Sequence, residues 1–501
     1  MTDTKRMLFA FLAIMVILFI WQVLTPKRSA PQTTAPPSQT AQTTTPAPAE
    51  PPRLAQTQPT EQQLQEPETE IFMENDLMKV TFSSYGGTVK SVYLKKYRAQ
   101  LIPASSTILQ TSLVADTLTR LNWQVAYQDD STLVFANNLR KTYRLNSDYT
   151  LSMRVESDQP LIAHLQVDYQ AGLALTEENV KEELKHQAVF YRNYIKTDKK
   201  TAAKVKPTTL DTVKWVGLKS KYFTSILAIN QTHGTVHLSP TDDARIGYRL
   251  IMPFETSADF TVYFGPLHYD ILRSYKMDWE AVVDLGWTRI FSVAILKFLM
   301  FLYAIFKNYG IAIIIFSIIM KAIFFPLSRL STRQMQQMQM LQPKIAELKK
   351  KYKNDPQALN QETMQLYRLY KINPLSGCLP LIFQLPIFWA LYAVLQKTIE
   401  LRQANFGLWI NDLSLKDPYY ILPILMGVSF LVQNFLTSAD KRNLALLIFM
   451  PIFLTVIFLN FPSGLQLYWL FFNLLSIGES IISRGGLKWK TQKTLMTTDK
   501  K

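Results

Sequence analysis

Long apolar runs in the second half of the chain constrain its fold more than any other feature. Residues 308–326 read NYGIAIIIFSIIMKAIFFP, in which Lys321 is the one charged residue. A helix of roughly 17–25 mostly apolar residues crosses a bilayer. Comparable runs occupy residues 376–396, 420–436, 444–460 and 464–483. We therefore predict five membrane spans in this half of the chain, over residues 308–483.

Another apolar run lies at residues 7–24, near the N-terminus. Lys5 and Arg6 before it would also suit a cleaved signal peptide, but Lys27 and Arg28 follow it in place of a small-x-small cleavage site. We interpret residues 1–24 as an uncleaved transmembrane signal anchor, which makes six spans. Residues 25–70 are rich in Pro, Thr and Gln, so we expect a disordered linker there.

The segment 71–281 has the pattern of a β domain. Short runs rich in Val, Tyr, Phe and Thr alternate with turn signals, such as Tyr85-Gly86-Gly87 between two strand-like runs. We predict a large antiparallel all-β domain of two packed sheets, with one short helix within residues 176–187. All five histidines lie in this domain but are scattered, and the lone Cys378 allows no disulfide, so no metal site or other cofactor site is expected.

Residues 282–307 are mostly apolar and permit two readings, a further span or a helix lying in the membrane interface. At about 100° per residue, Arg289 and Lys307 share one side of a helix and Lys297 lies about 80° away. One charged stripe on an apolar helix suits the interface. We therefore interpret this segment as an interfacial amphipathic helix.

The short loops set the expected orientation. Residues 329–372 carry nine Lys or Arg residues against Glu347, Asp355 and Glu362, and the tail 484–501 is also basic. Because cytoplasmic loops are enriched in Lys and Arg, we place this loop, the tail and both termini in the cytoplasm. Six spans then put the β domain on the outer, periplasmic side.

The basic loop itself has helical periodicity. Apolar residues recur at intervals of 3, 4, 3 and 4, and a turn at residues 353–356 precedes a second amphipathic stretch. We predict a cytoplasmic helical hairpin at residues 329–372, with Pro343 kinking or starting its first arm. The methionines of MQQMQM, residues 335–340, are interpreted as packing for the hairpin, with binding of varied apolar segments as the alternative.

Several polar residues lie within the predicted spans. A charge at mid-membrane costs roughly 2.5–3.5 kcal/mol on insertion scales. Lys321 could snorkel to the nearby end of its helix, and we interpret Glu479 in that way. The number of uncharged polar partners favours instead a wet cavity shared by several helices, around Lys321, Ser317, Gln384, Gln433, Asn434, Gln466 and Asn473.

No catalytic machinery is expected in this chain. It contains neither a GxxxxGK[ST] phosphate loop nor an HExxH pair, and no histidine falls in a predicted span. An enzyme is therefore not indicated. Function must rest on binding and partitioning rather than on chemistry of the chain's own.

At this point the sequence resembles a known family. MLQPKI, NPLSGCLPLIFQLPIFWALY and FPSGLQLYW, at residues 340–345, 373–392 and 461–469, are similar to the YidC family of bacterial membrane protein insertases. So are residues 400–428 and WVGLKSKYF at residues 215–223. The order of anchor, linker, outer domain, interfacial helix and core is also that of the family.

The resemblance implies an inner-membrane insertase that inserts and helps to fold nascent membrane proteins through a hydrophilic groove. It implies that Lys321 stands where the family usually has Arg, that Ser317 contacts substrate, and that Trp469 is an aromatic position beside Tyr468. It also implies a supersandwich outer domain. The partners it implies are nascent membrane proteins, SecYEG, SecDF, the ribosome, the signal recognition particle pathway and membrane lipids, with no specific DNA.

Overall fold

The structure is a computed structural model that describes residues 68–114, 123–241, 245–370, 372–373, 379–437 and 444–498. The predicted anchor at residues 1–24 and nearly all of the predicted linker lie outside the described residues. The described chain forms two compact units, one of residues 340–373 and one of all the others. Each unit is treated by itself below.

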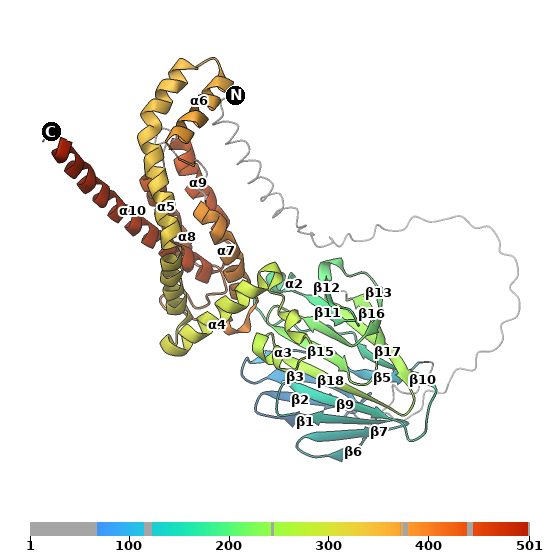
Figure 1. The fold of residues 1–501 in the computed structure, drawn as a ribbon. Helices are drawn as coiled ribbons and strands as arrows, with labels where there is room; N and C mark the ends of the chain where they lie inside the picture. The colour runs from blue at the N-terminus through green and yellow to red at the C-terminus, as the bar shows by residue number, and fades with distance from the viewer. Residues whose placement is uncertain are drawn as a thin grey trace, which may run out of the picture. The chain divides into compact units, whose positions relative to one another are not determined.

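The β domain contains three hydrogen-bonded sheets, and every pairing between the strands is antiparallel. One sheet is β1 (Glu70–Glu74), β2 (Met78–Ser83), β3 (Thr88–Leu94) and β4 (Ala99–Gln100). A five-stranded sheet has the order β13 (Thr208–Val213), β16 (Gly234–Pro240), β17 (Ile246–Phe254), β10 (Ala163–Tyr169) and β5 (Gln110–Leu113). Figure 1 shows these strands layered against one another.

The third sheet has nine strands and runs through the whole domain. Its order is β12 (Thr197–Thr201), β11 (Ala188–Arg192), β14 (Trp215–Lys219), β15 (Phe223–Ile229), β18 (Ser257–Pro266), β9 (Thr150–Glu156), β8 (Arg140–Leu145), β7 (Thr132–Ala136) and β6 (Gln124–Gln128). The antiparallel sandwich is as predicted, but the expected two sheets are three. The first four strands pair only among themselves, apart from an isolated bridge between Val89 and Ile108.

Local predictions for the domain are confirmed where the sequence signal was strong. Gly86 and Gly87 turn the chain between β2 and β3 with φ of 73° and 53°, a conformation that glycine adopts without steric cost. The short helix α2 (Val180–Leu184) lies within residues 176–187, capped by Asn179. Strands such as β7 show the alternating burial of a sheet with one wet face.

Strands β14 and β15 depart from that alternation, because all their residues are buried. One cause is packing against segments that follow the domain. The indole of Trp215 donates to the carbonyl of Met277 at 2.9 Å, and the hydroxyl of Tyr222 to Ser414 Oγ at 3.0 Å. The β14–β15 hairpin therefore lies between the domain core and the helical part of the chain.

Short helices join the domain to the apolar helices. They are α3 (Tyr269–Ser274), η3 (Trp279–Val283) and η4 (Gly286–Thr288), followed by α4 (Arg289–Phe306). The α-helix begins at Arg289, later than predicted, because Asp284 and Gly286 adopt left-handed backbone with φ of 57° and 68°. Helix α4 is long and apolar enough to span a membrane, so its interfacial placement stays a prediction.

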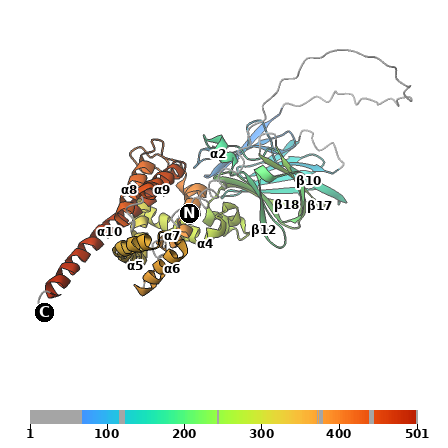
Figure 2. The same cartoon turned by 90° about the horizontal axis from the view of Figure 1, so that it is seen from above.

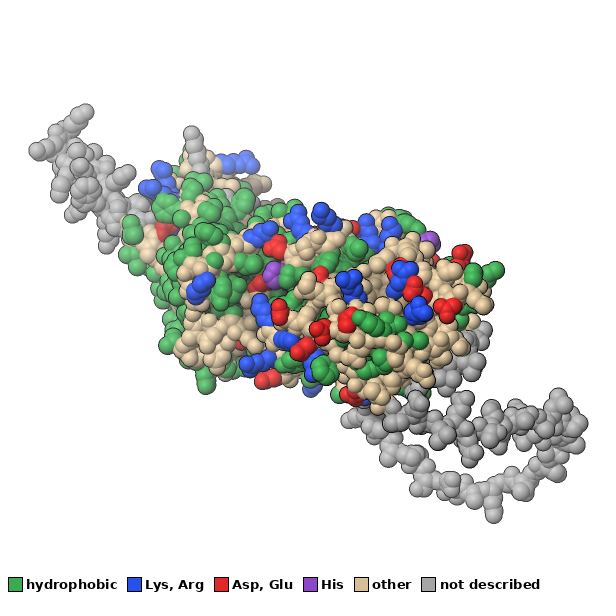
Figure 3. Space-filling view, turned by 90° about the horizontal axis from the view of Figure 1, so that it is seen from below, with side chains coloured by type: hydrophobic (Ala, Val, Ile, Leu, Met, Phe, Trp, Pro, Cys, Tyr) green, Lys and Arg blue, Asp and Glu red, His purple; other side chains and the backbone are tan. Residues whose placement is uncertain are grey.

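The remaining helices are α5 (Tyr309–Lys351), α6 (Pro356–Leu369), α7 (Leu379–Lys397), α8 (Ile421–Thr437), α9 (Leu444–Phe458) and α10 (Ser463–Thr498). Helix α5 continues past both Pro326 and Pro343, so the predicted hairpin arm does not start at Pro343 but prolongs the preceding apolar helix. Figure 2 shows the helical part from above. In Figure 3, apolar side chains gather over the helices, whereas charged ones are scattered over the β domain.

Three helical segments among the described residues are long and apolar enough to cross a membrane: Gly286–Phe306, Tyr309–Lys351 and Ser463–Ile482. Two shorter apolar helices lie at Ile421–Leu436 and Leu447–Phe458. The count of six spans therefore stays a prediction.

The loop between α7 and α8 covers the start of α5. The amide of Asn308 donates to the carbonyl of Phe406 at 3.0 Å, and a Cβ added at Gly310 would lie 1.9 Å from the Phe406 ring. We expect Gly310→Ala to destabilise the protein by about 1–3 kcal/mol, because the ring cannot yield without moving the loop.

Thermal unfolding in detergent measures this effect. Gly478→Ala on α10 is the matched control, since a Cβ there meets nothing within 4 Å and alanine favours a helix. Equal melting temperatures for the two variants would contradict the predicted close packing.

Candidate functional site

Lys321 lies buried among the apolar helices, with its ammonium group fully paired. Its Nζ is 2.7 Å from Glu479 Oε2 and donates to Ser476 Oγ at 2.8 Å and to Ser328 Oγ at 3.1 Å. The side chains of Lys321 and Glu479 are 9% and 7% exposed. Glu479 was expected to snorkel, and that interpretation is wrong because its carboxylate turns inward to the lysine.

The pair belongs to a network that joins α5 to α10. Ser328 accepts from Lys321 and donates to Glu479 Oε2 at 2.7 Å. The ring of Phe472 lies 5.2 Å from the ammonium nitrogen. A charge in an apolar interior is tolerated when it is paired and hydrogen-bonded; both conditions hold for Lys321 and for Glu479 Oε2, whereas Glu479 Oε1 has no hydrogen-bond partner among the described residues.

A second polar group lies one helical turn from the first. Ser317 Oγ donates to the carbonyl of Ile313 at 2.8 Å and contacts that of Tyr468 at 3.4 Å, while the amide of Gln384 donates to the Tyr468 hydroxyl. These contacts connect α5, α7 and α10. Four of the predicted groove residues therefore lie together: Lys321, Ser317, Gln384 and Tyr468.

Three other predicted residues face elsewhere. At about 100° per residue, Gln466, Trp469 and Asn473 lie roughly 100–160° around α10 from Tyr468. Gln466 donates to the carbonyls of Phe458 and Phe461 at the end of α9, at 2.8 and 3.0 Å.

The indole of Trp469 packs among aromatic rings, including a stacked contact with Phe430 of α8, with ring centroids 6.2 Å apart. The amide of Asn473 donates to Ser429 Oγ of α8 at 3.2 Å. The structure thus does not bring these three residues to Lys321, because they fasten α10 to α8 and α9. Gln433 and Asn434 are half-buried on α8, and their role stays a prediction.

Sequence reasoning named Glu479 but did not pair it with Lys321, and it missed Ser328 and Ser476. A signal was present, because Ser476 and Glu479 are three residues apart and share a side of α10 with Tyr468 and Phe472. The sequence alone could not show that this side of α10 packs against α5, because Lys321 and Ser476 are more than 150 residues apart in the chain.

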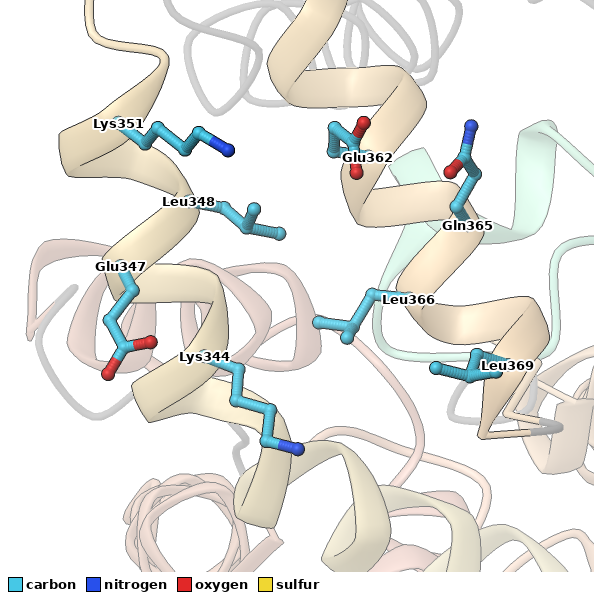
Figure 4. A pocket seen from close by; sticks show the side chains of 8 residues that line it. All are labelled: Lys344, Glu347, Leu348, Lys351, Glu362, Gln365, Leu366 and Leu369. Carbon is cyan, nitrogen blue, oxygen red and sulfur yellow. The ribbon is translucent and has the colours of Figure 1, made fainter.

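A separate cavity of about 590 Å³ lies in the unit of residues 340–373, between the end of α5 and α6 (Figure 4). Leu348, Leu366 and Leu369 make it apolar, and the side chains around them are Lys344, Glu347, Lys351, Glu362 and Gln365. Asp355 caps α6 by accepting from two backbone amides at 3.0 Å. Two apolar side chains of this unit are largely exposed, Met340 at 62% and Leu369 at 76%.

Comparison with known proteins covers nearly all of the described chain. A family model described as 60Kd inner membrane protein matches residues 301–490, and one described as YidC periplasmic domain matches residues 70–298. The membrane protein insertase YidC of Syntrophus aciditrophicus is 36% identical over 462 residues, covering 83% of this chain and 84% of the relative.

Two further matches have the same character. The membrane protein insertase YidC of Geotalea daltonii is 32% identical over 82% of this chain and 85% of its own length. A crystal structure described as an active YidC insertase with its first transmembrane domain resolved is 21% identical, with a TM-score of 0.40, over 83% of this chain and 93% of its own.

The buried ion pair predicts a non-additive mutational pattern. Removing one partner leaves a buried charge without compensation, so Lys321→Met and Glu479→Leu should each cost about 3–5 kcal/mol of stability. The double variant Lys321→Met/Glu479→Leu should lose much less, because no charge remains to be compensated.

Chemical or thermal unfolding of the four proteins in one detergent gives the double-mutant cycle. Simple addition of the two single losses would show that Lys321 and Glu479 do not depend on each other.

Proposed function

The chain belongs to the YidC family of membrane protein insertases, and we propose that its Lys321–Glu479 network is the point at which the core receives an incoming membrane segment. It is a bacterial inner-membrane protein with a periplasmic β domain, and its substrates are nascent membrane proteins. The proposal concerns how the core acts on them.

The observation that carries the proposal is the buried ion pair itself. The pair can be opened by exchange: an anionic group on a substrate replaces Glu479 beside Lys321, and the displaced Glu479 carboxylate takes up a proton or turns to water, so that no unpaired anion stays buried. At an effective dielectric near 20, a charge pair at about 4 Å is worth roughly 4 kcal/mol before desolvation. That is enough to bias capture and small enough to allow release.

The surrounding residues support a groove lined by α5, α7 and α10. Ser317, Gln384 and Tyr468 supply hydroxyl and amide groups next to the pair, where a polar flank of the substrate can exchange hydrogen bonds. The apolar part of the substrate then moves into lipid, which gains about 25 cal/mol per Å² of apolar surface removed from water. The step needs no ATP because this partition is downhill.

The remaining assignments belong to the same proposal. We place the β domain outside, both termini and the helical hairpin of residues 329–372 inside, and six spans in the membrane, with α4 at the interface. The cavity between α5 and α6 has two lysines and two glutamates around its apolar lining, and we propose that it meets the ribosome, the signal recognition particle pathway or the emerging chain. SecYEG and SecDF are proposed partners, and the basic tail can also bind anionic lipid.

Reconstitution tests the proposal against its rivals. Proteoliposomes that contain only this protein should insert a small single-span substrate, whereas a scaffold for the translocon would insert nothing alone. A secondary transporter would move a solute, and it would need inverted repeats that the sequence does not show.

The charge at position 321 should determine which substrates are inserted less efficiently by the variants. We expect Lys321→Ala to reduce insertion of substrates with acidic outer segments about tenfold or more, and Lys321→Glu to reduce it further, because two carboxylates then face each other. Substrates without acidic flanks should lose less, since apolar partition alone drives them.

The charge-swapped protein Lys321→Glu/Glu479→Lys is the control for folding. It restores a buried pair, so it should recover stability and part of the insertion of acidic substrates. Equal losses for acidic and neutral substrates in Lys321→Ala would mean that the lysine acts only through the stability of the core.

A further inference from the structure

Glu400 is a buried carboxylate that receives no well-formed hydrogen bond from any described residue. It lies in η6 (Ile399–Leu401), directly after α7 and on the side of the helices that contacts the β domain. Its side chain is 7% exposed, and neither carboxylate oxygen accepts a hydrogen bond within the described structure. Native proteins pair buried carboxylates or protonate them, so an orphan of this kind points to a bound proton.

The group closest to this carboxylate is an imidazole. His268 Nε2 lies 3.4 Å from Glu400 Oε1, and the imidazole is partly open to solvent. His268 also caps α3, because its Nδ1 accepts from the backbone N–H of Ile271 at 3.4 Å. A neutral imidazole that accepts at Nδ1 carries its proton on Nε2, so Nε2–H points at Glu400.

This arrangement decides where an additional proton binds. Protonating His268 at Nδ1 would place an N–H against the N–H of Ile271 and remove the helix cap. Protonating Glu400 removes a buried charge and disturbs no hydrogen bond. Glu400 is therefore the acceptor, and His268 is its route to solvent.

Every element packed around Glu400 contributes a polar or charged group. From α3, Asp270 raises the proton affinity of Glu400, and from the β3–β4 turn Lys96 lowers it. The phenols of Tyr97 and Tyr309 lie close enough to interact with its charge. The hydroxyl of Thr398, on its own segment, donates to the carbonyl of Val394 at 2.9 Å and also lowers the proton affinity of Glu400.

The same place is a junction between the β domain and the helical core. Arg402, two residues after Glu400, donates to Glu177 Oε1 at 2.8 Å and to the carbonyl of Tyr97 at 3.4 Å. The Tyr222 hydroxyl donates to Ser414 Oγ at 3.0 Å. A change of charge at Glu400 therefore acts on the contacts that hold the domain against the loop between α7 and α8.

We propose that Glu400 and His268 form a proton-binding site on the periplasmic side, and that proton binding tightens the docking of the β domain on the core. The site goes beyond the proposed insertion step, since it lies outside the network around Lys321. The site binds a proton from the surrounding solvent, and the bound proton changes how strongly the β domain packs against the helical core.

The pKa values give the pH window and its sign. Burial, aided by Asp270, raises the pKa of Glu400 to about 7 from its usual 4.5. A carboxylate whose pKa is raised by folding stabilises the junction most in acid, and this stabilisation is lost as pH rises from about 4.5 to 7. Burial lowers the pKa of His268, which acts in the opposite direction below pH 6.5, its ordinary value.

Glu400 and His268 change the stability of the junction in opposite directions as pH falls. The test therefore compares wild type with variants at the same pH. Glu400→Gln imitates the protonated acid in shape and charge. Hydrogen exchange of residues 399–404 in the full chain, in lipid nanodiscs, should show equal protection for wild type and Glu400→Gln at pH 5. At pH 8 the variant should be protected about tenfold or more above wild type.

Two controls separate this site from a general effect of pH. Asp270→Asn on α3 should keep the pH dependence with a lower midpoint, since it removes a charge that raises the affinity of Glu400 for the proton. His268→Asn keeps a helix-capping side chain and removes the Nε2 donor, so its midpoint should rise.

Infrared spectroscopy supplies a readout that does not depend on docking. The carbonyl stretch of a protonated carboxylic acid should appear as pH falls through about 7 in wild type and be absent from Glu400→Gln. A constant protection ratio from pH 5 to 8, or the same infrared signal in Glu400→Gln, would overturn the proposal. Neither measurement requires insertion activity.

Discussion

The pairing of Lys321 with Glu479 is the constraint on which the helical core depends. An ammonium has three N–H donors, and here Glu479, Ser476 and Ser328 accept one each, at 2.7, 2.8 and 3.1 Å. Because these acceptors lie on α5 and α10, the rotation of each helix about its axis is fixed by the lysine. The same rotation turns Gln466, Trp469 and Asn473 toward α8 and α9, where they fasten the rest of the bundle.

The β domain is joined to this core by a second set of polar contacts, which explains strands that break the usual alternation. Residues of the β14–β15 hairpin are buried on both faces because the segment between α3 and η3 and the loop between α7 and α8 cover the face that would otherwise be wet. Lys219 is one consequence. Burial lowers its pKa to about 7, and its Nζ donates to the carbonyl of Val283 at 3.4 Å and lies 5.9 Å from the centre of the Phe190 ring. The domain is thus packed against the core through polar contacts of its β14–β15 hairpin.

The sequence predicted the features that depend on neighbouring residues. Alternation along β7, the glycines between β2 and β3 and the apolar stripe that buries Leu341 and Ile345 were all readable, because period and turn chemistry are local. The sequence did not predict which of the two polar sides of α10 packs against α5, or that Glu479 forms an ion pair with Lys321. Those facts depend on helix packing between residues far apart in the chain. The orphan state of Glu400 was unreadable for the same reason, since α3, the β3–β4 turn and η6 bury it together.

The choice of lysine at position 321 follows from the number of donors. A guanidinium carries five N–H groups in a planar fork, and the three acceptors around Lys321 would leave two of them without a partner unless water or a substrate supplied more. An ammonium with its three acceptors is satisfied when the site is empty. In the mechanism proposed above, a substrate carboxylate enters by replacing an acceptor, namely Glu479, on the side of α10 with Ser476 and Phe472, and the displaced Glu479 carboxylate takes up a proton or turns to water. In this proposal Glu479 pairs with Lys321 again when the substrate leaves for lipid, so the resting pair would both admit an anionic flank and limit how long it stays.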